Sequence, residues 1–255
     1  MILRRVMEHV RTQNWFAVGI DFVIVVVGVF LGIQIGNWNE ARVSHVQEAE
    51  YLEQLRDEIA SNAHMARIQA QFVDRVVEGG RSGLQFLESD EPCTSDCERL
   101  VIDLFHASQV WGTGFFREKY QETNRRGIPS HEPLRLNVQS VYSYIVGWDT
   151  VNATPPPYRE QVRGYIPVDA MTLLWQDCYE VLDMANEVLT YGCEDALSEI
   201  DLSSALSAMQ ADRELEHSLR YWVGQNEYAR LNYPELIERA EASVDAINQH
   251  LERGE

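Results

Sequence analysis

Residues 16–36 read FAVGIDFVIVVVGVFLGIQIG, an apolar run of 21 residues in which Asp21 is the one charged side chain. As an α-helix this run is about 31 Å long, which matches the roughly 30 Å hydrocarbon core of a bilayer. It is far too long for a strand of a soluble protein. It is also longer than the apolar part of a signal peptide, and no small-residue cleavage site follows it. The sequence therefore predicts an uncleaved transmembrane helix over residues 16–36.

The charges on either side of the run predict its orientation. Three arginines precede it, namely Arg4, Arg5 and Arg11, whereas acidic residues dominate the stretch that follows. Because basic flanks stay in the cytoplasm, we expect residues 1–15 to form a basic amphipathic cytoplasmic tail and residues 37–255 a periplasmic domain. Trp15 and Trp38 flank the run, where indole rings suit the headgroup region. The expected location is a bacterial inner membrane.

Small residues line one face of the predicted span. At 100° per residue, four positions fall within about 80° of one another: Asp21, Gly28, Gly32 and Gly36. Two glycine motifs in register let helix backbones approach closely, so we expect this face to pack against a partner helix. A carboxyl group facing lipid is costly, so Asp21 is expected to face that partner or the cytoplasmic headgroups. The alternative is that the glycines reflect only the ordinary composition of membrane helices.

The sequence after the span has a helical pattern almost throughout. Residues 38–78 lack Pro and Gly and repeat apolar residues every three or four positions, which predicts a long helix ending at Gly79-Gly80. Further helices are expected over 97–111, 115–126, 132–147, 158–165, from Pro167 to Gly192, 203–231 and 234–252. No stretch alternates with a period of two between turn signals. The predicted fold is all-α, with one N-terminal transmembrane helix continuing into a long helix, followed by an extramembrane helical bundle.

Four cysteines follow the span: Cys93, Cys97, Cys178 and Cys193. Their separations favour two local disulfides, Cys93–Cys97 and Cys178–Cys193, although four cysteines allow three pairings. Free thiols are the first alternative. A metal site is the least favoured one, because Cys93 and Cys97 lack a second pair at zinc spacing. We therefore expect no metal and no cofactor.

The composition and motifs exclude several functions. The formal net charge of -19 argues against a nucleic-acid-binding protein, which needs a basic face. The GxSxG, HExxH and phosphate-loop signatures are missing, so we expect no enzyme and no catalytic residues. Six aromatic residues in the middle of the chain fit core packing, with a ligand pocket as the alternative: Tyr142, Tyr144, Trp148, Tyr158, Tyr165 and Trp175.

Basic residues are concentrated in one short segment of this acidic chain. The segment 113–126 contains Arg117, Lys119, Arg125 and Arg126. Two interpretations stay open. These side chains either pair with carboxylates elsewhere or contact an anionic group or a partner protein.

The motifs around the span resemble those of a known family. They are Gln13-Asn14-Trp15-Phe16-Ala17, Asp21-Phe22, Val25-Val26-Val27-Gly28-Val29 and Asn37-Trp38-Asn39-Glu40-Ala41-Arg42. This pattern is similar to that of uncharacterised bacterial membrane proteins classed as a domain of unknown function, with one span ending in an NWNE-type motif and a helical extramembrane region. The resemblance is specific over about residues 13–60. It implies the topology and supplies no activity.

These observations favour an accessory or scaffold subunit of an inner-membrane protein complex. Its partners would be other membrane subunits or a second copy, with the lipid bilayer contacted through one span. The alternative is a periplasmic ligand-binding or sensor-like helical domain that signals through a partner. That alternative is weaker because about 15 cytoplasmic residues leave no room for an output domain.

Overall fold

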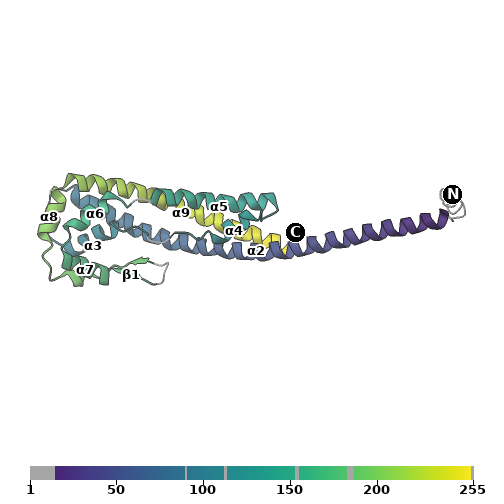
Figure 1. The fold of residues 1–255 in the computed structure, drawn as a ribbon. Helices are drawn as coiled ribbons and strands as arrows, with labels where there is room; N and C mark the ends of the chain where they lie inside the picture. Colours follow the sequence, from purple (N-terminus) through teal and green to yellow (C-terminus); the bar gives the residue numbers. More distant parts are fainter. Residues whose placement is uncertain (1–14, 90, 112–113, 153–154, 183–186, 254–255) are drawn as a thin grey trace, which may run out of the picture. The chain divides into compact units, whose positions relative to one another are not determined.

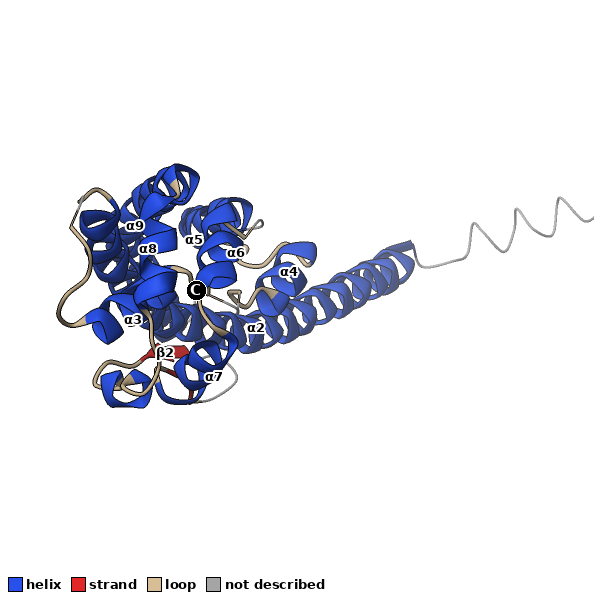
Figure 2. Ribbon diagram, turned by 90° about the vertical axis from the view of Figure 1, so that its left-hand side faces the viewer, coloured by secondary structure: helices blue, strands red, loops and turns tan. Residues whose placement is uncertain are grey.

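The computed structural model describes the backbone of residues 15–89, 91–111, 114–152, 155–182 and 187–253. These residues are helical almost throughout (Figures 1 and 2), which confirms the predicted all-α fold. The chain divides into two units, one up to Glu50 and one from Tyr51 on, and each is described by itself. Element labels follow Figure 1.

The first unit is the N-terminal part of helix α2 (Trp15–Leu87), which contains the predicted span. The side chains of residues 22–47 are all exposed, including the whole valine-rich run. The helix is long and apolar enough to cross a membrane. Residues 1–14 of the predicted cytoplasmic tail lie outside the described residues.

In the second unit, α2 continues past Gly79-Gly80 to Leu87, so the predicted end of the helix is wrong. These two glycines do not end the helix. They allow close packing between helices. A Cβ atom at Gly79 would clash with the backbone oxygen of Asp103, and one at Gly80 would clash with the side chain of Val223. Because glycine has no Cβ atom, the neighbouring elements can approach α2 closely at these two positions.

The second unit contains seven further α-helices and one 3₁₀ helix among the described residues. They are α3 (Cys97–Ala107), α4 (Glu118–Arg125), α5 (Glu132–Asn152), α6 (Pro157–Tyr165), α7 (Val168–Asp177), the 3₁₀ helix η1 (Glu194–Leu197), α8 (Ser203–Ala211) and α9 (Arg213–Arg253). Figure 1 shows α5 beside α9, while α3, α6, α7 and α8 gather at one end of the bundle. The predicted helices near residues 97, 115, 132 and 158 are therefore present.

Two apolar clusters hold the bundle together. One joins α2, α5 and the second half of α9, with Leu55, Ile59, Val141 and Ile145 fully buried. The other joins α3, α6, α7 and α8 to α2 and the start of α9, around residues such as Phe105. Burying each such side chain contributes roughly 1.5–3 kcal/mol. The second cluster fixes the positions of α3, α6 and α7.

The predicted helix from Pro167 to Gly192 is wrong beyond Asp177. The chain there forms the antiparallel strands β1 (Tyr179–Val181) and β2 (Glu187–Leu189), which lie beside α7 in Figure 2. Each strand has three residues, too few to show a period-two pattern in the sequence. The disulfide that closes the base of this hairpin, Cys178–Cys193, favours the hairpin over a helix.

The predicted boundary at Pro234 is also wrong, because α9 continues through this residue. A proline inside a helix costs about 3 kcal/mol, and the burial of Tyr233 and Leu236 on either side offsets this cost. The break falls instead at Asp212, which separates α8 from α9. Its carboxylate caps α9 by accepting hydrogen bonds from the backbone N–H groups of Glu214 and Leu215.

Candidate functional site

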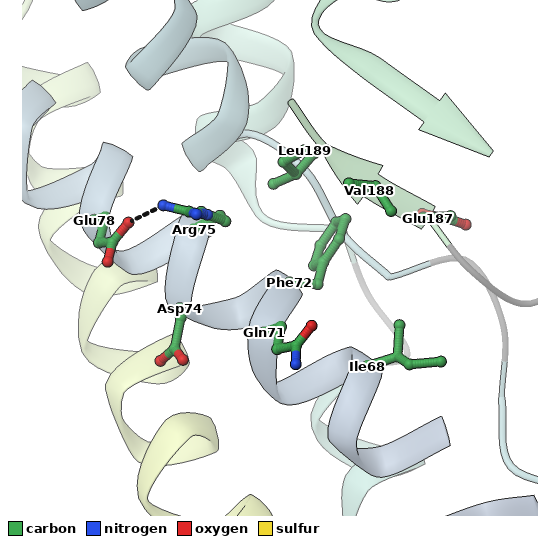
Figure 3. A pocket seen from close by; sticks show the side chains of 9 residues that line it. All are labelled: Ile68, Gln71, Phe72, Asp74, Arg75, Glu78, Glu187, Val188 and Leu189. Atoms are coloured by element: carbon green, nitrogen blue, oxygen red, sulfur yellow. Dashed lines mark hydrogen bonds and ion pairs between the residues drawn. The ribbon is translucent and has the colours of Figure 1, made fainter. Parts of the chain in front are cut away.

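A cavity of about 360 Å³ lies between α2 and β2 (Figure 3). Six of its lining residues come from α2 and three from β2: Ile68, Gln71, Phe72, Asp74, Arg75, Glu78, Glu187, Val188 and Leu189. The volume lies within the range of small-molecule pockets. Its lining mixes carboxylates with apolar side chains, so it suits a ligand that has both polar and apolar parts.

Most of the charge in the cavity is already engaged. The Arg75 guanidinium pairs with Glu78 at 2.9 Å and lies 5.1 Å from the ring centre of Tyr191. A second guanidinium, that of Arg99, lies 3.7 Å from the same ring centre. Phe72 forms the apolar side of the cavity and meets Trp111 edge to face at 5.1 Å. These contacts shape a binding surface and place no nucleophile beside a base among the lining residues.

His106 is fully buried on α3. Its Nε2 lies 2.9 Å from the carbonyl oxygen of Cys178, so the neutral ring donates a hydrogen bond there. Burial lowers the pKa of His106 to about 4, and the charges of Arg99 and Arg75 act in the same direction. His106 is therefore a neutral structural residue that fastens α3 to the base of the hairpin.

Both disulfides favoured by the sequence are present. Cys93 pairs with Cys97, and Cys178 pairs with Cys193. No cysteine is free. Two disulfides are typical of a protein in an oxidising compartment.

The predicted packing face of the span is open. A Cβ atom added at Gly28, Gly32 or Gly36 would meet nothing within 4 Å. Trp38 is exposed, as an interfacial anchor requires. The side chains of Trp15 and Asp21 lie outside the described residues.

The basic side chains of the segment 113–126 do not gather at one place in the structure. Arg126 pairs with Glu122 and lies over the ring of Tyr51, whereas Lys119 donates to the side chain of Gln54. Arg125 is exposed. Arg117 is not free either. The four side chains therefore do not converge on one ligand, and the interpretation as paired charges holds for Arg126.

Two polar residues that the sequence analysis missed hold this basic segment on α2. The carboxylate of the buried Glu58 accepts hydrogen bonds from the backbone N–H groups of Lys119 and Tyr120 and from the hydroxyl of Tyr142. Asn62 exchanges two hydrogen bonds with the backbone of Phe116. Among 40 acidic residues, the sequence carries no signal that singles out Glu58.

Four of the five described aromatic residues in the middle of the chain pack in or against the core, and the side chain of Trp148 lies outside the described residues. Tyr142 and Tyr158 are buried, and the Tyr158 hydroxyl donates to the carbonyl of Leu104. Tyr165 bonds Asp212, and Tyr144 bonds Asn232. Trp175 is more exposed and lies beside Arg163 of α6. The sequence analysis also missed Arg163 and its neighbour Arg159 on this helix. Their spacing of four residues on a short helix was visible in the sequence, but nothing distinguished it from an exposed helix face.

Comparison with known proteins finds no matching family model, no similar curated protein and no similar solved structure. The resemblance of residues 13–60 to single-span bacterial membrane proteins therefore stays a prediction.

Proposed function

We propose that the chain is a membrane-anchored accessory or scaffold subunit of a bacterial inner-membrane complex. In this proposal α2 crosses the bilayer with its N-terminus in the cytoplasm, and the helical domain lies in the periplasm. The exposed apolar helix and the two disulfides support the location. The arginines before the span support the orientation.

The observation that carries this proposal is an exposed apolar stripe on α9, which we define as Tyr221, Gly224, Tyr228 and Leu231. Tyr221 is 65% exposed, Tyr228 60% and Leu231 73%. At 100° per residue the four positions fall within about 80° of one another. Exposed tyrosine and leucine at this spacing are typical of surfaces that bind a partner helix.

The outward face of α9 is apolar along the stripe and mainly acidic beyond it, so the stripe is confined to one part of the helix. Beyond Leu231 the same face continues as Glu235, Glu238, Ala242 and Asp245, all exposed. A helix that merely faced solvent would have no reason to gather its aromatic residues in one half. The stripe is therefore a candidate contact for a partner subunit.

The open glycine face of the span supplies a second candidate contact. In lipid there is little hydrophobic drive between helices, so close packing at small residues must hold them together. Gly28, Gly32 and Gly36 leave room for such an approach.

A ligand-binding domain is the second candidate function, favoured by the cavity between α2 and β2. The paired state of Arg75 makes this cavity a weaker argument than the apolar surfaces.

The test is substitution at the middle of the glycine face. Gly32→Ile keeps the span apolar but separates two helices where their backbones would be closest. We expect this variant to stay in the membrane and to lose its complex in mild detergent, as measured by native electrophoresis with mass spectrometry. The control is Val26→Ile, about 120° away on the helix, which should leave the complex intact. A Gly32→Ile variant that migrates with the parental complex would contradict packing through this face.

A further inference from the structure

Two arginines of α6 converge on one residue. Arg159 and Arg163 lie one helical turn apart, and both are half-buried. A guanidinium N–H of Arg159 donates to the backbone oxygen of Ser108 at 3.0 Å. The Nε of Arg163 donates to the hydroxyl of the same serine at 2.9 Å. The two positive groups are therefore held near each other at the end of α3.

Aromatic rings fix the orientation of Arg163. Its guanidinium carbon lies 5.0 Å from the ring centre of Trp175 and 5.6 Å from that of Phe105. Trp175 in turn meets Phe105 and Tyr179 edge to face, at 5.1 and 4.8 Å. Such contacts engage the face of a guanidinium, so its hydrogen bonds are made by the N–H groups at its edge.

The pair lacks a counter-charge among the described residues. Ten other arginines form ion pairs with acidic side chains, namely Arg56, Arg67, Arg75, Arg81, Arg99, Arg126, Arg213, Arg220, Arg230 and Arg239, whereas the exposed Arg125 does not among the described residues. No described carboxylate lies within ion-pair distance of Arg159 or Arg163. The carboxylate of Glu187 bonds the Tyr179 hydroxyl, and its charge acts to raise the pKa of Arg159 without forming an ion pair with it. Two neighbouring cations without an ion pair among the described residues are unexpected in a chain with a net charge of -19.

Burial and mutual repulsion both act against the charges of these two arginines. Burial lowers the pKa of both guanidinium groups, and the charge of Arg159 helps to lower that of Arg163 to about 10. One terminal nitrogen of Arg163 is buried and has no hydrogen-bond partner. Buried polar groups normally have partners, so this nitrogen marks a place where an acceptor belongs.

We propose that Arg159 and Arg163 form a binding site for a phosphate monoester or inorganic phosphate. Two neighbouring guanidinium groups match a phosphate, which carries close to two negative charges at neutral pH and three acceptor oxygens. A carboxylate would neutralise only one of the two cations. The site is independent of the apolar stripe on α9, so it stands whether or not the chain is a scaffold subunit.

The test is calorimetric titration of the full chain in detergent micelles with inorganic phosphate, compared with acetate at the same ionic strength. We expect saturable binding of phosphate and much weaker binding of acetate. Arg163→Gln and Arg159→Gln should each weaken phosphate binding by about tenfold or more, because each removes charge-assisted hydrogen bonds. Arg125→Gln removes the same charge from an exposed position on α4 and should change nothing. Equal affinity for phosphate in all four proteins, or no preference over acetate, would overturn the proposal.

A fallback variant and two further ligands keep this test decisive. If Arg163→Gln does not fold, Arg159→Gln decides alone, because the Arg159 guanidinium bonds only a backbone oxygen. Glycerol 3-phosphate and vesicles containing phosphatidic acid distinguish the source of the group. Binding of the soluble ester supports a free phosphate compound, and Arg159-dependent binding of the vesicles alone supports a lipid headgroup. Binding of inorganic phosphate alone supports the free anion as the ligand, and binding of none of the three contradicts the site.

Discussion

At the scale of single residues, the sequence was informative where the chemistry is local. The separations of the four cysteines favoured the two bridges that the structure contains, because a short loop brings its own ends together. His106 and Glu58 carried no such signal. Their roles come from partners more than 50 positions away in the chain, Cys178 and Tyr142, and one sequence does not reveal such pairs.

His106 gives a prediction about pH. Its pKa is lowered from 6.5 to about 4 in the folded protein, so between these values the unfolded chain binds the proton more strongly. Its contribution to stability is therefore present above pH 6.5 and is lost as the pH falls toward 4. The shift corresponds to roughly 3 kcal/mol.

The measurement is the free energy of unfolding at pH 7 and at pH 4.5, for the parent protein and for His106→Gln. The glutamine amide can still donate to the Cys178 oxygen but does not titrate. We expect the parent to lose more stability than the variant over this range. Identical losses would show that His106 is not the titrating group.

At the scale of elements, helices were predictable and their ends were less so. The apolar periodicity located α3 and α5, because each buries one face in a core cluster. The sequence predicts that a helix ends at Gly79-Gly80 and that another begins at Pro234. Tertiary packing overrode the local preference in both cases, at a close contact between helices and at a buried helix face.

Glycines in two helices should therefore respond oppositely to alanine. Gly79→Ala forces a methyl group against the backbone of Asp103, so we expect a loss of about 1–3 kcal/mol in unfolding free energy. Gly224 lies inside α9 with nothing within 4 Å, so Gly224→Ala should add about 0.5–1 kcal/mol. Thermal unfolding of the full chain in micelles measures both. A stabilised Gly79→Ala variant would refute the close contact between α2 and α3.

At the scale of the whole molecule, the sequence predicted an apolar N-terminal helix followed by a helical bundle. The length of the run 16–36 decided the first part, since few other structures accommodate 21 such residues. The candidate sites could be recognised only in the three-dimensional structure. The cavity joins α2 to a hairpin more than 100 positions later, and the stripe on α9 became visible only once burial separated it from the helix's inner face.

The central claim is that the external domain contacts a partner through the stripe on α9. The most direct measurement is photo-crosslinking in native membranes, with the crosslinking residue placed at Leu231 in one variant and at Ala242 in another. Both positions are exposed on the same face of α9, about 20° apart in angle and eleven residues apart in sequence. The account predicts a discrete crosslinked species from position 231 and none from position 242. No adduct at 231, or the same adducts at both positions, would contradict it.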